Sequence, residues 1–312
     1  METIVSRKPR AKRLVRPKDP EPTSTPERAL RLLAAIAQNR FLATNQLATI
    51  DGGSEQNVSR WLKALFHNGF VDRRRVSLTG PLVYAITRKG AKLLREKGHL
   101  INADVDWAEK NKRAGAKFIE HTLAIAQFMT ALEKACEARS DIELIREREI
   151  IAAAPDSTQE AREPLRWLIQ RIERGRKEFS TVVPDGLFGL SFTDGTASYF
   201  LLEVDRGTIP LNRTDTEGTT DWRKNIRYKL ATYYDGWKAG RHLTQFGVKQ
   251  MRVLMLTSSP KRLQNMLSLQ EEITDGKGSN FFLFADQTQL QATDPLSIEW
   301  LSGKWEQVRL TD

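Results

Sequence analysis

Three carboxylates in the second half of the chain are spaced for metal-assisted chemistry. Asp185 follows Pro184 in one apolar segment, and Glu203 and Asp205 lie two residues apart at the end of the next. Side chains at i and i+2 of a β-strand project from the same face. If the two segments pair as a hairpin, Asp185, Glu203 and Asp205 converge, and their hard oxygen atoms suit Mg²⁺ or Mn²⁺.

The same carboxylates also have an ordinary structural interpretation. An aspartate after a proline is common in turns, and carboxylates at strand ends often pair with arginines, here Arg206 or Arg223. Three carboxylates without a metal repel one another, so we expect a raised pKa for at least one of them unless arginines compensate. The pattern therefore leaves a metal site and a set of ion pairs both open.

A second group of polar residues has types that suit contact with DNA. Most of them lie on a predicted helix at 54–69, away from its apolar face, and three consecutive arginines come shortly after this helix. Gln and Asn suit adenine and Arg suits guanine, so Gln56, Asn57 and Arg60 are the expected base readers. The remaining candidates are expected to contact the phosphate backbone of the DNA. The DNA-contact candidates are Gln56, Asn57, Ser59, Arg60, Lys63, Arg73, Arg74 and Arg75.

The first hundred residues predict the elements that would present this helix. Apolar residues recur at helical spacing in 26–39, 44–50, 54–69 and 88–98, and two short strands flank a Gly-Pro turn within 70–87. Ser54 is the expected N-cap of the third helix, and Gly69 ends it. Three helices, a β-hairpin and a closing helix, in this order, predict a winged helix-turn-helix. The segment from Leu65 to Gly90 resembles the wing region of bacterial winged-helix DNA binders.

The excess of positive over negative charge is confined to the first third of the chain. Residues 1–92 hold 18 Lys and Arg against 7 Asp and Glu, whereas residues 93–312 hold 31 against 32. A surplus in one domain points to a polyanionic partner for that domain, so double-stranded DNA is the expected ligand. A winged helix that serves protein contacts alone is the other interpretation.

The remaining residues predict an α/β domain. A long helix at about 113–138 precedes strands at 141–151, 181–192 and 197–207, a helix at 221–240, a strand at 251–258, a helix at 260–274 and a strand at 280–287. The basic insertion before 181 is interpreted as a solvated helix or hairpin. The predicted domains are a disordered basic arm at 1–24, a winged helix at 25–100, a linker at 101–112 and the α/β domain at 113–312.

Composition excludes several other classes of protein. The apolar runs are shorter than a membrane span requires, and the N-terminus carries no apolar segment typical of a secretory signal. Cys136 is the sole cysteine, which excludes an internal disulfide framework and a cysteine-based zinc cluster. We therefore expect a cytoplasmic protein.

The order helix, strand, strand with Pro-Asp, strand with Glu-x-Asp, helix and strand resembles the PD-(D/E)xK restriction-endonuclease-like fold. This resemblance implies metal binding by Asp185 and Glu203. Asp205 stands where the fold has its lysine, and some members carry that lysine on the following helix, where Lys224 or Lys229 is available. The candidate catalytic residues are Asp185, Glu203, Asp205 and Lys229.

The whole chain from about residue 26 resembles the replication-relaxation family of plasmids and mobile elements. The resemblance rests on the winged helix, His121 in HTLAIAQF, the motifs VVPDGLFGL and FLLEVDRGT, and the Lys229–Tyr233 pair. It implies a DNA-binding accessory role in replication, relaxation or mobilisation. Other replication or mobilisation proteins and a second copy of the chain, in a homodimer, are further candidate partners. The alternatives are a Mg²⁺-dependent deoxyribonuclease and a transcriptional regulator with a non-catalytic C-terminal domain.

Overall fold

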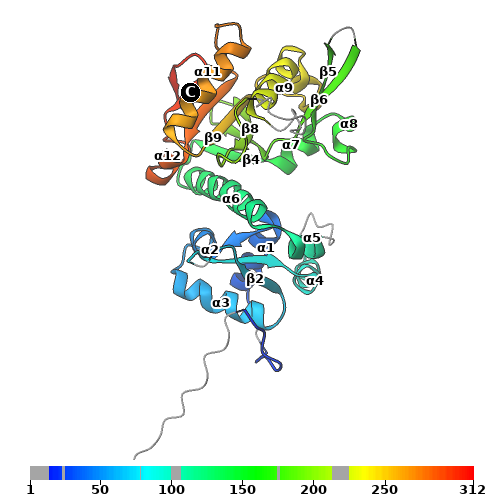
Figure 1. Cartoon of the computed structure of the whole chain (residues 1–312). Coiled ribbons are helices and arrows are strands. Elements are labelled where there is room, and N and C mark those ends of the chain that lie inside the picture. Colours follow the sequence, from blue (N-terminus) through cyan, green and yellow to red (C-terminus); the bar gives the residue numbers. More distant parts are fainter. Residues whose placement is uncertain (1–13, 23–24, 78, 100–106, 174–175, 213–224) are drawn as a thin grey trace, which may run out of the picture. The chain divides into compact units, whose positions relative to one another are not determined.

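The computed structural model describes residues 14–22, 25–77, 79–99, 107–173, 176–212 and 225–312 (Figure 1). The chain divides into two compact units, Met1–Thr130 and Ala131–Asp312, and each is described by itself. Most of the predicted arm at 1–24, residues 101–106 of the predicted linker, Arg223 and Lys224 lie outside the described residues.

The N-terminal unit combines helices with a small antiparallel sheet whose strand order is β1-β3-β2. Its elements are α1 (Glu27–Asn39), β1 (Leu42–Ala43), α2 (Thr44–Asp51), α3 (Glu55–His67), β2 (Val71–Arg75), β3 (Leu82–Ile86), α4 (Arg88–Glu96), α5 (Trp107–Arg113) and the first part of α6 (Ala116–Glu137).

Helical spacing of apolar residues explains why α1 to α3 pack together. Leu33 of α1, Leu47 of α2 and Leu62 of α3 are completely buried in one core. Ser54 caps α3, because its hydroxyl accepts a hydrogen bond from the backbone N–H of Asn57. The helices expected at 26–39, 44–50, 54–69 and 88–98 and the hairpin expected within 70–87 are therefore confirmed.

The C-terminal unit is built on a large mixed sheet with the order β12-β11-β10-β9-β8-β7-β4. Its elements begin with β4 (Ile142–Arg146), α7 (Glu147–Ala153), α8 (Asp156–Gln159), β5 (Trp167–Glu173), β6 (Arg176–Val182), β7 (Gly186–Phe192) and β8 (Ala197–Val204). They continue with α9 (Ile226–Lys238), α10 (Arg241–Phe246), β9 (Arg252–Thr257), α11 (Pro260–Ile273), β10 (Phe282–Asp286), α12 (Gln287–Ala292), β11 (Trp300–Ser302) and β12 (Gln307–Val308).

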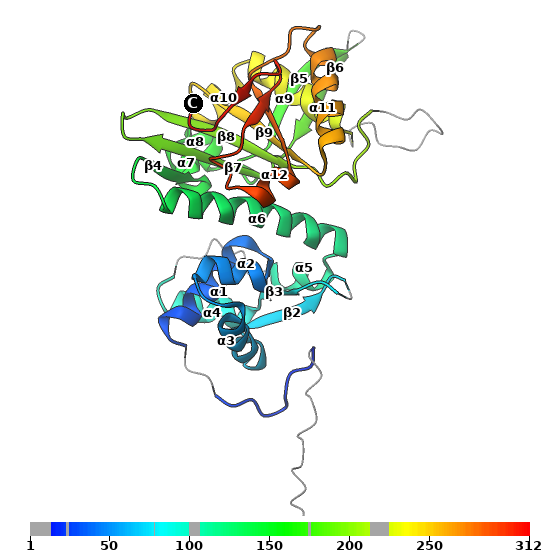
Figure 2. The same cartoon turned by 90° about the vertical axis from the view of Figure 1, so that its left-hand side faces the viewer.

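β8 is an interior strand of this sheet, with a neighbouring strand on each side. β4, β7 and β8 are antiparallel neighbours, while β9 runs parallel to β8 on its other side. Helices α9 and α11 lie on one side of the sheet (Figure 2). Their core residues share a cluster with Leu201 of β8 and with Val253 and Met255 of β9. Leu201 and Glu203 have the same parity along β8, so Glu203 faces these helices.

The structure corrects three predictions about this half of the chain. The strand expected at 141–151 ends at Arg146, because Glu149 accepts from the backbone N–H of Arg146 and starts helix α7. Pro184 and Asp185 precede β7 instead of lying inside a strand, and Pro184 has no N–H to donate to a ladder. The basic insertion contains the β5–β6 hairpin, one of the two forms expected, but this hairpin packs against α9 with Trp167 buried instead of being fully solvated. The C-terminal elements α12, β11 and β12 were not predicted.

Together these elements form a mixed α/β protein. Within the described ranges, no helix combines the length and the apolar character needed to cross a membrane.

Gly236 lets the β5–β6 hairpin approach α9. A Cβ atom at this position would lie 2.0 Å from the Trp167 Nε1 atom, and Trp167 is fully buried. We expect Gly236→Ala to lower the free energy of unfolding by about 1–3 kcal/mol, as overpacking does. Gly115→Ala is the control, because a Cβ atom there has nothing within 4 Å. Denaturant unfolding checks this, and equal effects of both substitutions would contradict the close approach.

Candidate functional site

Glu203 is a carboxylate buried under α9, on an interior strand of the sheet. It lies near the end of β8, between β7 and β9, and only 2% of its surface is exposed. The Lys229 Nζ atom lies 2.5 Å from one carboxylate oxygen, and the Tyr233 hydroxyl donates to the other at 2.6 Å. Both oxygen atoms therefore have a donor, which a buried charge requires.

Helix α9 delivers these two donors to the same place. Lys229 and Tyr233 are four residues apart, so they lie on one face of the helix. The Asn225 side chain begins the helix by accepting from the backbone N–H of Tyr228 at 2.8 Å. The Lys229–Tyr233 motif is thus explained by a single acceptor, Glu203, on the neighbouring strand.

The electrostatics of this group follow from burial. Burial raises the pKa of Glu203 and the nearby Asp185 raises it further, although Lys229 acts in the opposite direction. Burial lowers the pKa of Lys229, but the negative charges of Glu203 and Asp185 outweigh it and the pKa is raised. Burial next to Glu203 also raises the pKa of Tyr233 well above its usual value. Glu203 is thus one carboxylate of the three with the raised pKa that we expected, and burial contributes more to this shift than repulsion by Asp185 does.

Asp185 lies beside Glu203, immediately before β7. Its backbone N–H donates to the Leu202 carbonyl at 2.8 Å, and its side chain accepts from the backbone N–H of Val204 at 2.8 Å. These contacts extend the β7–β8 pairing by one residue beyond Gly186, which pairs with Leu202. Asp185 is half-buried, in contrast to Glu203.

Asp205 belongs to a separate ion pair. Its carboxylate accepts hydrogen bonds from the Arg262 guanidinium on α11 and from the Thr257 hydroxyl at 2.9 Å. The period of two does put Glu203 and Asp205 on the same side of the sheet, but each meets a different helix. In the part of the chain that the structure describes, there is no group of three or more His, Cys, Asp or Glu side chains arranged to hold a metal ion. The predicted trio of Asp185, Glu203 and Asp205 is therefore not brought together.

The predicted DNA-contact residues of α3 fall on one face. Gln56, Ser59, Arg60 and Lys63 are exposed, while the opposite face holds Val58, Leu62, Leu65 and Phe66 in the core. Asn57 is half-buried, and its side-chain oxygen accepts from the Arg60 guanidinium. An open hollow of about 420 Å³ beside this face is lined by Arg28, Asn57, Arg60, Trp61 and Ala64.

The three consecutive arginines of β2 have different environments. The Arg73 guanidinium lies over the Phe66 ring, 3.9 Å from its centroid. Arg74 donates to the backbone carbonyls of Ala114, at 2.9 Å, and of Asn111. Arg75 is the exposed member of the three. Two of these arginines thus make contacts inside the N-terminal unit.

Sequence reasoning missed two partners of the carboxylates. The pattern of α9 predicts Tyr233 as a core residue, although its spacing from Lys229 is also a signal for a shared acceptor. Arg262 is not a candidate for Asp205 on sequence grounds, because 57 residues separate them and no local pattern links them. The candidates for that pairing were Arg206 and Arg223, and Arg223 lies outside the described residues.

These features define an α/β protein with a helix-rich N-terminal unit and a C-terminal mixed sheet that carries a buried Glu–Lys–Tyr group. The model of the replication-relaxation family matches residues 33–245. The chain belongs to the replication-relaxation family. No curated protein and no solved structure gave a significant match.

The Glu203–Lys229 pair predicts a large effect when one partner is removed. Lys229→Met leaves a buried carboxylate without its cation, so we expect a loss of about 3–5 kcal/mol in the free energy of unfolding. Because the pKa of Lys229 is raised, this contribution is present at neutral pH and is lost only as the pH rises through that pKa. Denaturant unfolding at pH 7 measures it.

The matched control is Lys134→Met, which breaks a pair with Glu137 whose side chains are 40% and 55% exposed. Such a surface pair contributes about 0–1 kcal/mol. Adding Glu203→Gln to Lys229→Met should recover part of the loss, because the buried charge is then gone. Equal losses for Lys229→Met and Lys134→Met would overturn this account.

Proposed function

We propose that the chain is a DNA-binding accessory protein of plasmid or mobile-element replication, relaxation or mobilisation. In this proposal the N-terminal unit is a winged helix-turn-helix and α3 is its recognition helix. Membership of the replication-relaxation family links the chain to these processes. Double-stranded DNA is the proposed partner, and proteins of the same processes or a second copy of the chain are further candidates.

The observation that carries this proposal is the two-sided character of α3. Its exposed polar residues, Gln56, Ser59, Arg60 and Lys63, follow the spacing i, i+3, i+4, i+7 and so form one stripe. Its apolar residues fix the other side in the core. A helix held in this way offers side chains to a major groove without disturbing the fold. Arg60 suits guanine, and its hydrogen bond to Asn57 orients it.

Charge supports the same conclusion. Between Arg60 and Lys92 the chain has eight Lys and Arg residues and a single acidic residue, Asp72. Lys and Arg near phosphates release counterions, which is the main source of affinity for DNA. Within the β2–β3 hairpin we assign phosphate contact to Arg75, because it is the exposed one of the three consecutive arginines.

A second candidate function is metal-dependent DNA hydrolysis at the C-terminal sheet. The specific observation that favours it is Lys229, which lies 2.5 Å from Glu203 and is on the helix after β8, where some PD-(D/E)xK members carry their lysine. The antiparallel β4, β7 and β8 followed by a parallel β9 also suit that fold. Asp185 and Lys229, both only partly buried, would face the substrate.

The residues present fit Mg²⁺ or Mn²⁺ with two carboxylate ligands. Mg²⁺ commonly binds one or two protein carboxylates and keeps several waters, and Asp185 and Glu203 are adjacent. Each oxygen of Glu203 that accepts from Lys229 or Tyr233 retains a second lone pair. A bound ion would neutralise charge on a DNA phosphate. Asp185 and Glu203 would hold it, and Lys229 would orient Glu203.

The proposed readout by α3 is tested with a duplex selected from a random pool by binding to the full chain. Arg60→Ala should weaken binding to the selected duplex about 5- to 150-fold, because one bidentate base contact contributes roughly 1–3 kcal/mol. Its preference at one base pair should relax at the same time. Fluorescence anisotropy against the selected and a scrambled duplex gives both quantities.

Arg75→Ala should weaken both duplexes alike and reduce the slope of log affinity against log salt by about 0.9, the value for one phosphate contact. Arg139→Ala removes the same charge from an exposed residue paired with Asp141 in the other unit, and it should change neither binding nor slope. Binding by the wild type that does not respond to salt would refute the proposed interface. Identical behaviour of Arg60→Ala and Arg75→Ala would refute the assignment of α3.

The nuclease candidate is tested with supercoiled plasmid in Mg²⁺ or Mn²⁺. Asp185→Asn should reduce metal-dependent nicking by about 100-fold or more, as expected for the loss of a group that stabilises charge in the transition state. Melting curves with and without metal should show stabilisation of the wild type and not of Asp185→Asn. A wild type that neither nicks DNA nor gains stability with metal would rule out this function and leave a non-catalytic domain.

A further inference from the structure

We propose that the open hollow between α1 and α3 is a subsite for one phosphate of the DNA backbone, and that Arg28 is the residue that binds this phosphate. The inference rests on the DNA binding proposed above and adds a strand contact beside the helix that reads bases. The hollow has a volume of about 420 Å³. It is lined by Arg28 of α1 and by four residues of α3, which are Asn57, Arg60, Trp61 and Ala64.

The hollow adjoins the proposed base-reading side of α3. Its four lining residues on this helix follow the spacing i, i+3, i+4, i+7, so they form one stripe. The exposed polar stripe described above lies next to it, and Arg60 belongs to both stripes. A helix that enters a major groove brings its flank close to the backbone that borders the groove. The hollow therefore lies where a backbone phosphate is expected when Arg60 reaches a base.

A buried carboxylate holds Arg28 at the edge of the hollow. The Arg28 Nε atom donates to both oxygen atoms of Asp51, at 2.9 and 3.1 Å, and its Nη2 atom donates to one of them. The Asp51 side chain is 1% exposed, whereas that of Arg28 is 36% exposed. These bonds use one edge of the guanidinium, and the Nη1 atom donates to no residue that the structure describes. The other edge is thus presented in a fixed orientation, and its planar fork suits a phosphate.

Gly53 makes room for this ion pair in the turn between α2 and α3. A Cβ atom at this position would clash with the Arg28 Nη2 atom and would lie 2.6 Å from the Asp51 Oδ2 atom. The next residue, Ser54, caps α3. Arg28 is therefore tied to the turn that begins α3, so the fold itself fixes its distance from that helix.

The lining of the hollow favours a strand of DNA over a free anion. Arg28 and Arg60 supply positive charge, while the carboxylate of Asp51 is covered. Trp61 and Ala64 supply an apolar wall, and Trp61 is held in place because it packs against the core of the unit. A DNA strand alternates charged phosphates with the carbon atoms of deoxyribose, so it matches both parts of the lining. A free phosphate ion would leave the apolar wall without a contact.

The test uses a double variant of the full chain that leaves the net charge unchanged. Arg28→Gln together with Asp51→Asn removes the guanidinium and its carboxylate, so no buried charge is left unpaired. Binding to the selected duplex should weaken about 5- to 10-fold at 0.1 M salt, and the slope of log affinity against log salt should fall by about 0.9, the value for one phosphate. Fluorescence anisotropy over a range of salt concentrations measures both.

The matched control is Arg139→Gln together with Asp141→Asn. It removes another arginine–aspartate pair joined by two hydrogen bonds, in the other unit of the chain, and it should change neither the affinity nor the slope. Because both double variants keep the net charge, a general electrostatic effect predicts no difference between them. Equal affinities and slopes for the wild type and the Arg28/Asp51 variant would overturn the inference.

A second measurement locates the phosphate and separates the subsite from a loss of folding. Methylphosphonates placed one at a time in the selected duplex should weaken wild-type binding at each contacted phosphate. The Arg28/Asp51 variant should become insensitive at one of these positions and keep the others, whereas a folding defect would weaken binding at all positions alike. An unchanged pattern would refute the subsite and leave the proposed DNA binding intact. A wild type that binds no DNA would refute the proposed function, and the subsite with it.

Discussion

The arrangement of the C-terminal unit depends on one buried carboxylate. Glu203 is buried on an interior strand of the sheet, where an unpaired charge is prohibitively costly. Its two donors come from a single helix, so α9 must lie over β8 with Lys229 and Tyr233 facing the strand. The β5–β6 hairpin packs on the same helix through Gly236. A requirement for charge compensation therefore fixes the position of a helix, and that helix fixes a hairpin.

The N-terminal unit uses its arginines in several ways. Its basic residues are mostly at the surface, but Arg74 meets backbone carbonyl groups and Arg73 meets an aromatic ring, while Arg28 pairs with Asp51, whose side chain is 1% exposed. Guanidinium groups suit these roles, because they are planar and weakly hydrated. Arg74 in particular holds the chain between α5 and α6. The three adjacent arginines of β2 thus divide between internal support and the surface.

The sequence predicted the elements better than the contacts between them. Helical spacing and the Ser54 cap gave α1 to α3, and alternation gave most of the sheet. Lys229 was a candidate, together with Lys224, through the resemblance to the PD-(D/E)xK fold, and it does contact Glu203. Periodicity describes only the chain near each residue, so it missed Arg262, which reaches Asp205 across 57 positions. It also misplaced the end of β4, where one glutamate favours a helix over a strand.

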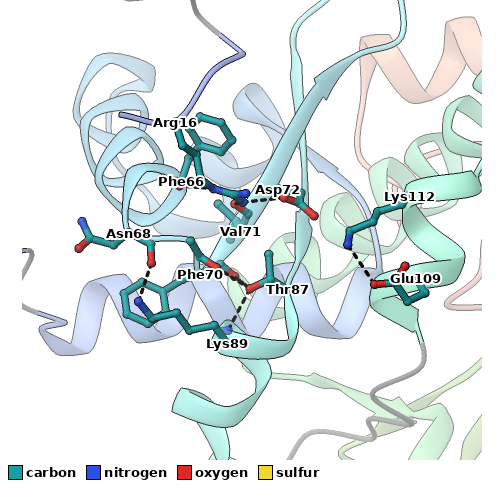
Figure 3. A network of polar contacts seen from close by, with 12 residues as sticks. Arg16, Phe66, Asn68, Phe70, Val71, Asp72, Thr87, Lys89, Glu109 and Lys112 are labelled. Carbon is teal, nitrogen blue, oxygen red and sulfur yellow. Dashed lines mark hydrogen bonds and ion pairs between the residues drawn. The ribbon is translucent and has the colours of Figure 1, made fainter. Parts of the chain in front are cut away.

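Arg16 donates hydrogen bonds to the Phe66 and Val71 carbonyls and to the Asp72 carboxylate (Figure 3), and these contacts have a consequence for the order in which the protein is synthesised. Arg16 leaves the ribosome early, whereas its three acceptors are made 50 to 56 residues later. During that interval the Arg16 side chain has none of these three acceptors. Its hydrogen bonds form only when α3 and β2 have formed, so a chain truncated before residue 66 lacks all three acceptors.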